Sequence, residues 1–406
     1  MNTLSEVLEY FQPVIGIEIH AQLKTKSKAY CADKNEYGHL PNTLTSPISL
    51  AHPGTLPKFN KEVISHAVRL GIACNCIITK KMHFDRKNYF YADLPKGYQI
   101  TQDKTPICTK GEVKIRLKDQ SEKQIELTRI HMEEDSGKSI HDLDPLNTLI
   151  DLNRAGVPLL EIVTEPVLRS SEEAYQYVTE IRKLLRYLDI CDGNMEEGSM
   201  RCDVNISIMK KGSNTFGQRV EIKNLNSIRS VQKSIDYEIV RHAKLITNND
   251  KVGVETRTFD APSGVTIAMR KKEAAHDYRY FPEPDLNPLK IEEDYIKSIQ
   301  DAMPPLPNEL FEKFTKQYKL STYDALVIIE QKEIAIFFES IVKHTNNFKS
   351  AANWVMGNIK SHLNQQAINI DSFEVSAEKI AQLIKLIDNN EINNSVASQK
   401  VFPEMI

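Results

Sequence analysis

The sequence predicts an α+β protein with a strand-rich catalytic part over residues 1–294 and an all-α part over residues 295–406. Fourteen of its fifteen glycines lie within residues 1–264, as expected where tight turns join strands. A proline-rich stretch over residues 282–308 then excludes continuous helix. Beyond it, apolar residues recur at spacings of three and four, which predicts helices.

Several stretches of the first part alternate between apolar and polar residues, which is typical of half-buried strands. In the first of them, isoleucines alternate with Gly16, Glu18 and His20. Two stretches flank the polar turn 119–123 and predict an antiparallel hairpin. The predicted strands cover residues 14–20, 112–118, 124–130, 201–208 and 218–224. Strands of this kind, backed by helices, favour an antiparallel sheet with one polar face.

Helices are predicted from capping residues and apolar spacing. Ser170 followed by Glu173 resembles a capping box, and an apolar stripe over residues 178–188 follows it. In the second part the predicted helices cover residues 324–331, 334–344, 351–363 and 377–386.

Charge and composition exclude several classes of protein. The chain has 52 Lys and Arg against 55 Asp and Glu, a net charge of −3, which excludes nucleic-acid binding through bulk positive charge. No apolar run approaches the ~18 residues of a membrane span, and no cationic segment opens the chain. Its six cysteines form no CxxC pair, as expected for reduced thiols. We therefore expect a soluble cytoplasmic protein without a membrane partner.

Carboxylates dominate the polar strand faces. Glu18, Asp203 and Glu221 lie mid-strand opposite buried residues, and His20 lies two positions from Glu18. Further acidic groups follow at residues 133–135, 161, 165, 196 and 197. Converging carboxylates raise one another's pKa unless cations are present, and the set favours a site for hard divalent metal, usually Mg²⁺. The alternative is a solvated acidic face with Lys and Arg partners.

Basic residues are interleaved with aromatic ones in two stretches. Arg86, Lys87 and Lys96 lie among tyrosines in residues 84–99, and Arg279 lies between Tyr278 and Tyr280. Such stretches suit a nucleotide or a single-stranded RNA end, although half-buried loop packing is the alternative. The polar strand faces add Arg201 and Lys223. We take Arg86, Arg201, Lys223, Arg279 and Tyr280 as the candidate cofactor-binding residues.

Common nucleotide and hydrolase motifs are absent from the sequence. Gly137-Lys138-Ser139 resembles the end of a P-loop, but Met132 stands where the first glycine is required. No GxGxxG or GxSxG occurs.

The motifs FDRKNYFYADLPKGYQI, HMEEDSGK, DLNRAGVPLLEIVTEP, MEEGSMRCDVN, EIKNLNS and DYRYFPEPDL occur in this order. Together they resemble the B subunits of aspartyl/glutamyl-tRNA amidotransferases. The resemblance implies a cradle domain related to the glutamine synthetase catalytic fold, and a helical domain that contacts tRNA. It also implies ATP and Mg²⁺ as cofactors, and phosphorylation of the side-chain carboxylate of Glu-tRNA(Gln) or Asp-tRNA(Asn) before amidation. The implied partners are an amidase A subunit, which supplies ammonia from glutamine, and a small C subunit, in a heterotrimer.

The resemblance also implies roles for individual residues. The implied metal ligands are Glu18, His20, Glu134, Glu161, Asp203 and Glu221, and Glu133 competes with its neighbour for one place. Lys87, Lys96 and Glu134 match the polar residues of the family's ammonia passage. The predicted catalytic residues are Glu18, His20, Glu134, Asp203, Lys87 and Lys96.

Two departures from the family pattern lead to further expectations. Some members carry a cysteine zinc site, but here Ser46 and Ser49 stand at two of the positions and leave Cys31 alone, so we predict no zinc. The chain ends at VFPEMI, so we expect the family's C-terminal tail domain to be absent. Two other functions stay open: a non-catalytic scaffold that presents tRNA, and a two-metal phosphodiesterase.

Overall fold

The computed structural model describes residues 3–271 and 278–406. The chain divides into two compact units, Met1–Met303 and Pro304–Ile406. The division falls a few residues after the predicted boundary at 294/295, because helix α5, Glu293–Asp301, packs against helix α2, Lys61–Ala73, of the first unit. Within the described residues, no helix has both the length and the apolar character that a membrane crossing requires.

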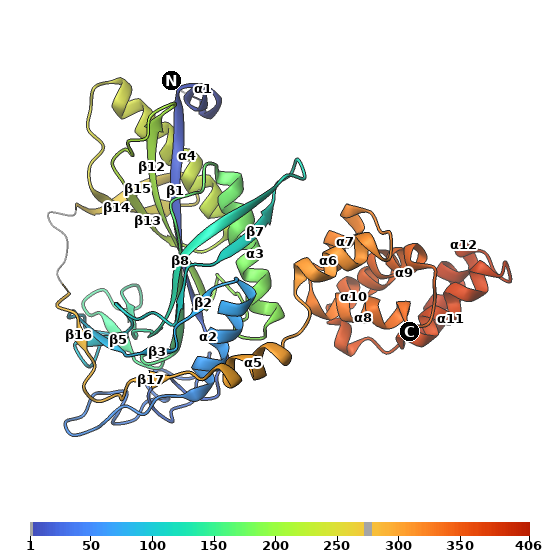
Figure 1. The fold of residues 1–406 in the computed structure, drawn as a ribbon, viewed down its shortest axis with the longest axis horizontal. Helices are drawn as coiled ribbons and strands as arrows, with labels where there is room; N and C mark the ends of the chain where they lie inside the picture. The colour runs from blue at the N-terminus through green and yellow to red at the C-terminus, as the bar shows by residue number, and fades with distance from the viewer. Residues whose placement is uncertain (1–2, 272–277) are drawn as a thin grey trace. The chain divides into compact units, whose positions relative to one another are not determined.

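A ten-stranded sheet forms the body of the first unit (Figure 1). Its order is β15-β14-β13-β12-β1-β11-β8-β6-β2, and β7 also pairs with β8. The strands are β1 Phe11–Gln22, β2 Ile77–Ile78, β6 Cys108–Thr109, β7 Glu112–Arg116, β8 Glu122–Glu134, β11 Pro158–Thr164, β12 Met200–Lys210, β13 Val220–Leu225, β14 Glu255–Asp260 and β15 Val265–Lys271.

The sheet is mixed, whereas the sequence predicted an antiparallel one. Strands β13 and β14 pair in parallel, and the other pairings are antiparallel. The reason is the connection: helix α4, Ile228–Thr247, crosses between β13 and β14, and a crossover returns the chain to the edge where the previous strand began. The predicted hairpin of β7 and β8 is confirmed.

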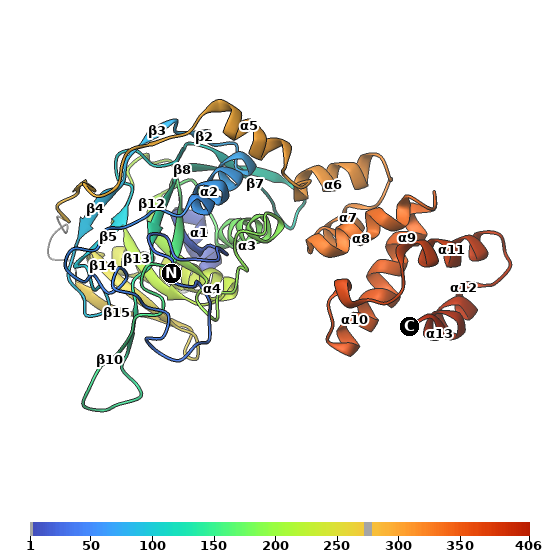
Figure 2. The ribbon, with the colours of Figure 1, turned by 90° about the horizontal axis from the view of Figure 1, so that it is seen from below.

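Strand β1 lies inside the sheet, between β12 and β11. Ile15, Ile17 and Ile19 are fully buried, whereas Glu18 and His20 are partly exposed, which confirms the predicted alternation. Helices α3, Ser171–Tyr187, and α4 pack against each other beside the sheet (Figures 1 and 2). The Ser170 hydroxyl accepts the Glu173 N–H, so the predicted N-cap is confirmed. The Glu173 carboxylate, however, accepts the Arg169 N–H, so this is not a reciprocal capping box.

Short elements complete the first unit. They are α1 Leu4–Tyr10, the three-stranded sheet of β4 Asp85–Asn88, β5 Tyr98–Thr101 and β16 Phe281–Pro282, and the pairs β3 Lys81–Met82 with β17 Leu289–Lys290 and β9 Lys138–Ile140 with β10 Leu149–Asp151.

The second unit is helical throughout its ordered elements, as predicted. Its elements are α6 Pro307–Lys316, α7 Thr322–Ile328, α8 Lys332–Val342, α9 Phe348–Trp354, η1 Val355–Ile359, α10 Lys360–Gln366, η2 Ile370–Ser372, α11 Ala377–Asp388, α12 Asn394–Val396, η3 Ala397–Val401 and α13 Phe402–Met405. Phe314, Phe338 and Trp354 lie in its core. The predicted helix 351–363 contains a π-helical turn, η1.

A buried carboxylate joins α4 to the edge strands β14 and β15. The fully buried Glu238 lies 2.8 Å from Arg241, 3.0 Å from His242 and 3.2 Å from Arg257. Burial alone would raise the pKa of Glu238, but the contacts with His242 and Arg241 lower it to about 2. Removal of one partner from such a buried group of charges is strongly destabilising, because it leaves the remaining charges uncompensated.

We expect Glu238→Gln to destabilise the first unit at pH 7 by about 3 kcal/mol, because the pKa falls from 4.5 to about 2 on folding. A lowered folded pKa contributes stability above the unfolded pKa, and this stability is lost as the pH falls from about 5 to about 2. The difference from wild type should therefore shrink with acidification. Thermal unfolding at pH 7 and pH 4 tests this, with the exposed Glu293→Gln as control. A difference in stability between wild type and Glu238→Gln that does not change with pH would contradict this prediction.

Candidate functional site

The register of four neighbouring strands places three of the predicted site residues and His131 in one row. Across β12, β1, β11 and β8, Arg201 lies opposite His20, His20 opposite Glu161, and Glu161 opposite His131. Because side chains of directly paired residues share a sheet face, this row stands on the polar face that the sequence predicted.

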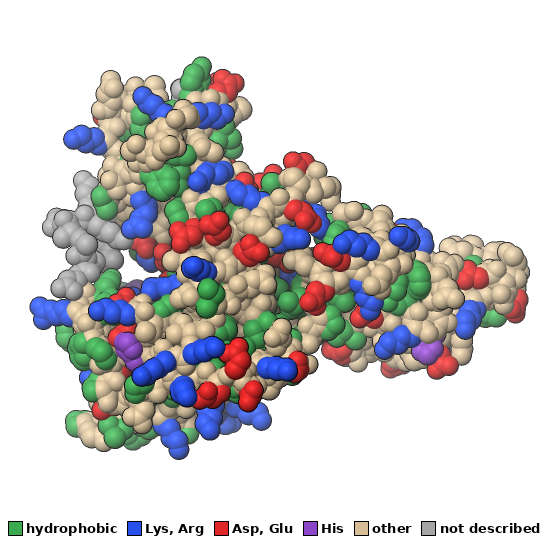
Figure 3. Space-filling model, in the orientation of Figure 1, with side chains coloured by type: hydrophobic (Ala, Val, Ile, Leu, Met, Phe, Trp, Pro, Cys, Tyr) green, Lys and Arg blue, Asp and Glu red, His purple; other side chains and the backbone are tan. Residues whose placement is uncertain are grey.

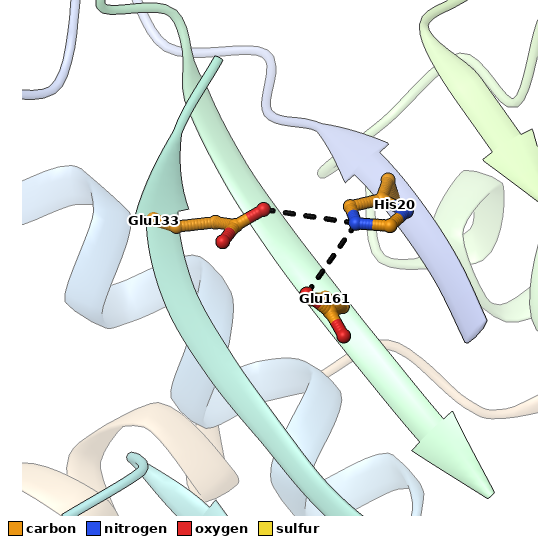
Figure 4. A group of neighbouring side chains, drawn as sticks. All are labelled: His20, Glu133 and Glu161. Carbon is orange, nitrogen blue, oxygen red and sulfur yellow. Dashed lines mark ion pairs between the residues drawn. The ribbon is translucent and has the colours of Figure 1, made fainter. Parts of the chain in front are cut away.

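His20, Glu133 and Glu161 form the first of two clusters of potential metal ligands (Figure 4). The Nε2 atom of His20 lies 3.4 Å from Glu161 and 3.7 Å from Glu133. On the other side, Nε2 of the buried His131 lies 3.4 Å from Glu161 and 3.6 Å from Glu133. Two carboxylates are thus held between two imidazoles.

The electrostatics of this cluster follow from its burial and its charges. Burial alone would lower the pKa of His20, but the contacts with Glu161 and Glu133 raise it. Burial likewise opposes the charged form of His131, yet Glu161 and Glu133 raise its pKa to about 9. For Glu161, burial would raise the pKa, but His131 and His20 hold it well below its usual range. The two imidazoles therefore favour the ionised form of the Glu161 carboxylate.

Glu18, Asp203 and Glu221 form the second cluster, across β1, β12 and β13. Lys223 lies 2.7 Å from Asp203 and 3.0 Å from Glu221. Burial raises the pKa of Glu18, and the charges of Glu161 and Asp203 raise it further. Two further contacts hold the cluster: Asn205 donates to Glu18 at 2.8 Å, and Thr256 donates to Glu221 at 3.0 Å.

The neighbours Glu133 and Glu134 point to opposite sides of β8, as strand alternation requires. Glu133 belongs to the first cluster. Glu134 instead pairs with Lys96 and accepts the Ile100 N–H at 3.0 Å. Glu134, which was also expected to be a metal ligand, belongs to neither group of potential ligands among residues 3–271 and 278–406.

Lys96 and Glu134 line a cavity of about 190 Å³. Tyr30, Tyr98 and Cys31 line it as well. The Lys96 ammonium lies 5.7 Å from the Tyr30 ring centre and 5.6 Å from that of Tyr98. Ser49, from the stretch where some family members carry zinc-site cysteines, also lines the cavity, and its hydroxyl donates to Asp33 at 2.6 Å.

Three of the candidate cofactor-binding residues, Arg86, Arg201 and Lys223, are paired with carboxylates of the protein. The guanidinium of Arg86 forms a two-pronged ion pair with Glu283, at 2.8 Å for each prong, and lies 4.1 Å from the Tyr98 ring centre. This buried pair joins β4 to the segment after β16 and argues against Arg86 as a nucleotide ligand. Arg201 donates to Asp135 at 2.7 Å.

The second aromatic–basic stretch, at residues 278–280, contacts the first, at residues 84–99. Asn88 donates to the Arg279 carbonyl at 2.8 Å, and Lys87 lies 4.9 Å from the Tyr278 ring centre. Burial raises the pKa of Tyr280, and the charges of Asp103 and Glu133 raise it further while Arg129 opposes them. Asp277, the first residue of this motif, lies outside the described residues.

Sequence reasoning missed His131, although it opens the HMEEDSGK motif. Its position two residues before Glu133 could have indicated its place on this face, because alternate residues of a strand lie on the same face of the sheet. Asp135, whose partners are Arg201 and Gln22, was noted only as part of an acidic run.

Comparison with known proteins identifies the family of this chain. Residues 13–297 match the model described as GatB/GatE catalytic domain, and residues 336–406 match the model described as GatB domain. The chain belongs to the GatB/GatE family. Both clusters and the cavity lie within the part that matches the catalytic domain.

Alignments with B subunits of aspartyl/glutamyl-tRNA(Asn/Gln) amidotransferases extend over nearly all of this GatB/GatE family chain. The chain is 50% identical over 395 residues to the B subunit of the aspartyl/glutamyl-tRNA(Asn/Gln) amidotransferase of Trichlorobacter lovleyi, and the match covers 97% of this chain and 82% of the relative. The corresponding protein of Clostridium tetani is 46% identical with the same coverage. That of Persephonella marina is 46% identical over 396 residues, covering 97% and 83%.

Proposed function

We propose that this chain is the B subunit of an ATP-dependent aspartyl/glutamyl-tRNA(Asn/Gln) amidotransferase, a ligase that forms a carbon–nitrogen bond. It activates the side-chain carboxylate of Glu-tRNA(Gln) or Asp-tRNA(Asn) and then admits ammonia. The observation that carries this proposal is the pair of ligand clusters on one sheet face, in a chain that is 50% identical to the B subunit of Trichlorobacter lovleyi.

The two clusters suit divalent metal ions. Carboxylate oxygens are the ligands that Mg²⁺ prefers, and the second cluster offers oxygen from Glu18, Asp203 and Glu221. The first cluster adds the His20 nitrogen to Glu133 and Glu161. When bound, such ions neutralise nucleotide phosphates and polarise a phosphoryl oxygen. Without them, a face this rich in carboxylates would repel both ATP and an anionic substrate.

The proposed reaction has two steps, activation of the substrate carboxylate and then its amidation. In the first, a substrate carboxylate oxygen forms a bond to the γ-phosphorus of ATP, the bond from that phosphorus to the bridging oxygen breaks, and ADP leaves with the electron pair. In the second, NH₃ attacks the acyl carbon, the bond from carbon to the phosphate oxygen breaks, and phosphate leaves. The nitrogen releases a proton to a base. The first step is necessary because a free carboxylate has no adequate leaving group.

The cavity beside the face is the proposed end of the ammonia path. Its paired Lys96 and Glu134 line a space too small for tRNA but ample for ammonia. A carboxylate and an amine in contact can take a proton from NH₄⁺ and leave neutral NH₃. Lys87, which lies beside Tyr278 and Tyr89, is proposed as a further residue of this path.

We assign the cradle, residues 1–294, to ATP and to the aminoacylated end of tRNA, and propose its kinship with the glutamine synthetase catalytic fold. The helical domain, residues 295–406, would contact the tRNA body. On its visible face, Lys and Arg alternate with Asp and Glu (Figure 3), so such contact would depend on local groups or shape and not on a uniformly positive surface. The proposed partners are an amidase A subunit and a small C subunit, in the cytoplasm.

The test is amidation of Glu-tRNA(Gln) by the chain together with amidase and small subunits, in the presence of ATP and Mg²⁺, with glutamine or ammonium as nitrogen donor. We expect Gln-tRNA(Gln), ADP and phosphate in equal amounts. A scaffold would consume no ATP of its own, and a phosphodiesterase would cleave tRNA without ATP. Either result would refute the proposal.

A further inference from the structure

Arg129 stands on the same face of β8 as His131 and Glu133. Ile130 and Met132, which alternate with these residues, are fully buried in the core, whereas Arg129 is partly exposed. Because alternate residues of a strand share a face, the Arg129 side chain belongs to the face that carries both ligand clusters.

The register places Arg129 beside the two clusters. Arg129 lies opposite Val163 on β11, and Glu18 on β1 lies opposite Val163 from the other side. Asp203 on β12 lies opposite Glu18 and completes this row, which runs next to the row of His131, Glu161 and His20. Two strand spacings, about 10 Å, separate the backbones of Arg129 and Glu18. An arginine side chain is long enough to reach the space above Val163 that lies between them.

Arg129 differs from the other basic residues of this face in its partners. Lys223 is held by Asp203 and Glu221, and Arg201 by Asp135. The Arg129 guanidinium donates to the main-chain carbonyl of Asp103 at 3.1 Å. Within residues 3–271 and 278–406, no carboxylate lies within ion-pair distance of Arg129, although the face is rich in them. Among these residues its charge is therefore uncompensated by a carboxylate and available to an anionic ligand.

We infer that Arg129 is a catalytic residue that binds the phosphoryl group during its transfer from ATP to the substrate carboxylate. As the bond from the γ-phosphorus to the bridging oxygen breaks and the carboxylate oxygen attacks, negative charge spreads over the three other phosphoryl oxygens. A guanidinium fits two of these oxygens with parallel hydrogen bonds. Arg129 does this from the β8 side, while Glu18 and Asp203 would hold any bound cation on the β1 and β12 side. This inference rests on the proposed function.

The experiment compares Arg129→Ala and Arg129→Lys with wild type in the assembled complex. Ammonium is the nitrogen donor, so the amidase and the ammonia path do not limit the rate. Arg219→Ala, which removes an exposed arginine of the same unit, is the control. We expect Arg129→Ala to lower kcat by ~100-fold with a small change in the KM for ATP, since the contact strengthens in the transition state. The kcat of Arg129→Lys should fall by ~10-fold, because lysine keeps the positive charge but cannot form the two parallel hydrogen bonds of a guanidinium.

Chemical rescue separates catalysis from folding. Added guanidinium at millimolar concentration should restore part of the kcat of Arg129→Ala, whereas an equal concentration of NaCl should not. Failure of rescue, or wild-type kcat in Arg129→Ala, would overturn the inference. If Arg129→Ala does not fold, wild-type kcat in Arg129→Lys would overturn it. A wild-type complex that makes no Gln-tRNA(Gln) would refute the proposed function instead, so the two failures are distinguishable.

Discussion

Glu18→Gln and Asp203→Asn should each abolish amidation, whether glutamine or ammonium supplies the nitrogen. The two carboxylates belong to one cluster with ligand atoms within 4.8 Å of one another, and each substitution removes one negative charge from it. A cation held by this cluster would contribute several kcal/mol of transition-state stabilisation, so its loss would lower the rate by ~100-fold or more. Because activation precedes ammonia attack, the donor does not matter.

The measurement is the rate of Gln-tRNA(Gln) formation with each donor, together with ADP release. Glu165→Gln serves as the control, since this carboxylate follows β11, outside both clusters, and accepts from Thr128 at 2.8 Å. Ammonium-driven amidation that survives in both cluster variants would show that the cluster does not serve activation. Higher Mg²⁺ should restore part of the lost rate if the defect lies in metal affinity.

Lys96→Met should have a different effect. Amidation should be lost when glutamine is the nitrogen donor and retained when ammonium is the donor. Lys96 pairs with Glu134 inside the cavity, on the opposite side of β8 from the cluster residue Glu133. Without the Lys96 ammonium, the pair could no longer take a proton from incoming NH₄⁺. Loss of such general-base catalysis ordinarily lowers a rate by ~100-fold. High free ammonium supplies NH₃ from bulk solvent and bypasses this step.

The readout is the ratio of glutamine-driven to ammonium-driven amidation in the assembled complex. Lys104→Met, at an exposed position of the same unit, should keep the wild-type ratio. Equal losses with both donors would show that Lys96 serves phosphate binding, and an unchanged ratio would show that the cavity is not part of the path.

The face that carries the chemistry could be predicted from the sequence because strand alternation is a local property. In β1, the isoleucines identify the buried side, and Glu18 and His20 therefore had to share the other. The long motifs identified the family for the same reason, since they are contiguous in the chain. Helices of the second unit followed from the spacing of apolar residues.

Which residues meet across strands was decided by the tertiary structure. Pairing of β1 with β11 and of β11 with β8 brings His20, Glu161 and His131 into one row, although more than a hundred residues separate the first from the last. Tertiary packing likewise brings Lys96 to Glu134, and the pairing of β16 with β4 in a separate sheet brings Glu283 to Arg86. No local pattern contains this information, because register depends on the packing of whole strands and their connections. The local alternation predicted the polar face and its carboxylates, and the strand pairing decided which of these carboxylates meet.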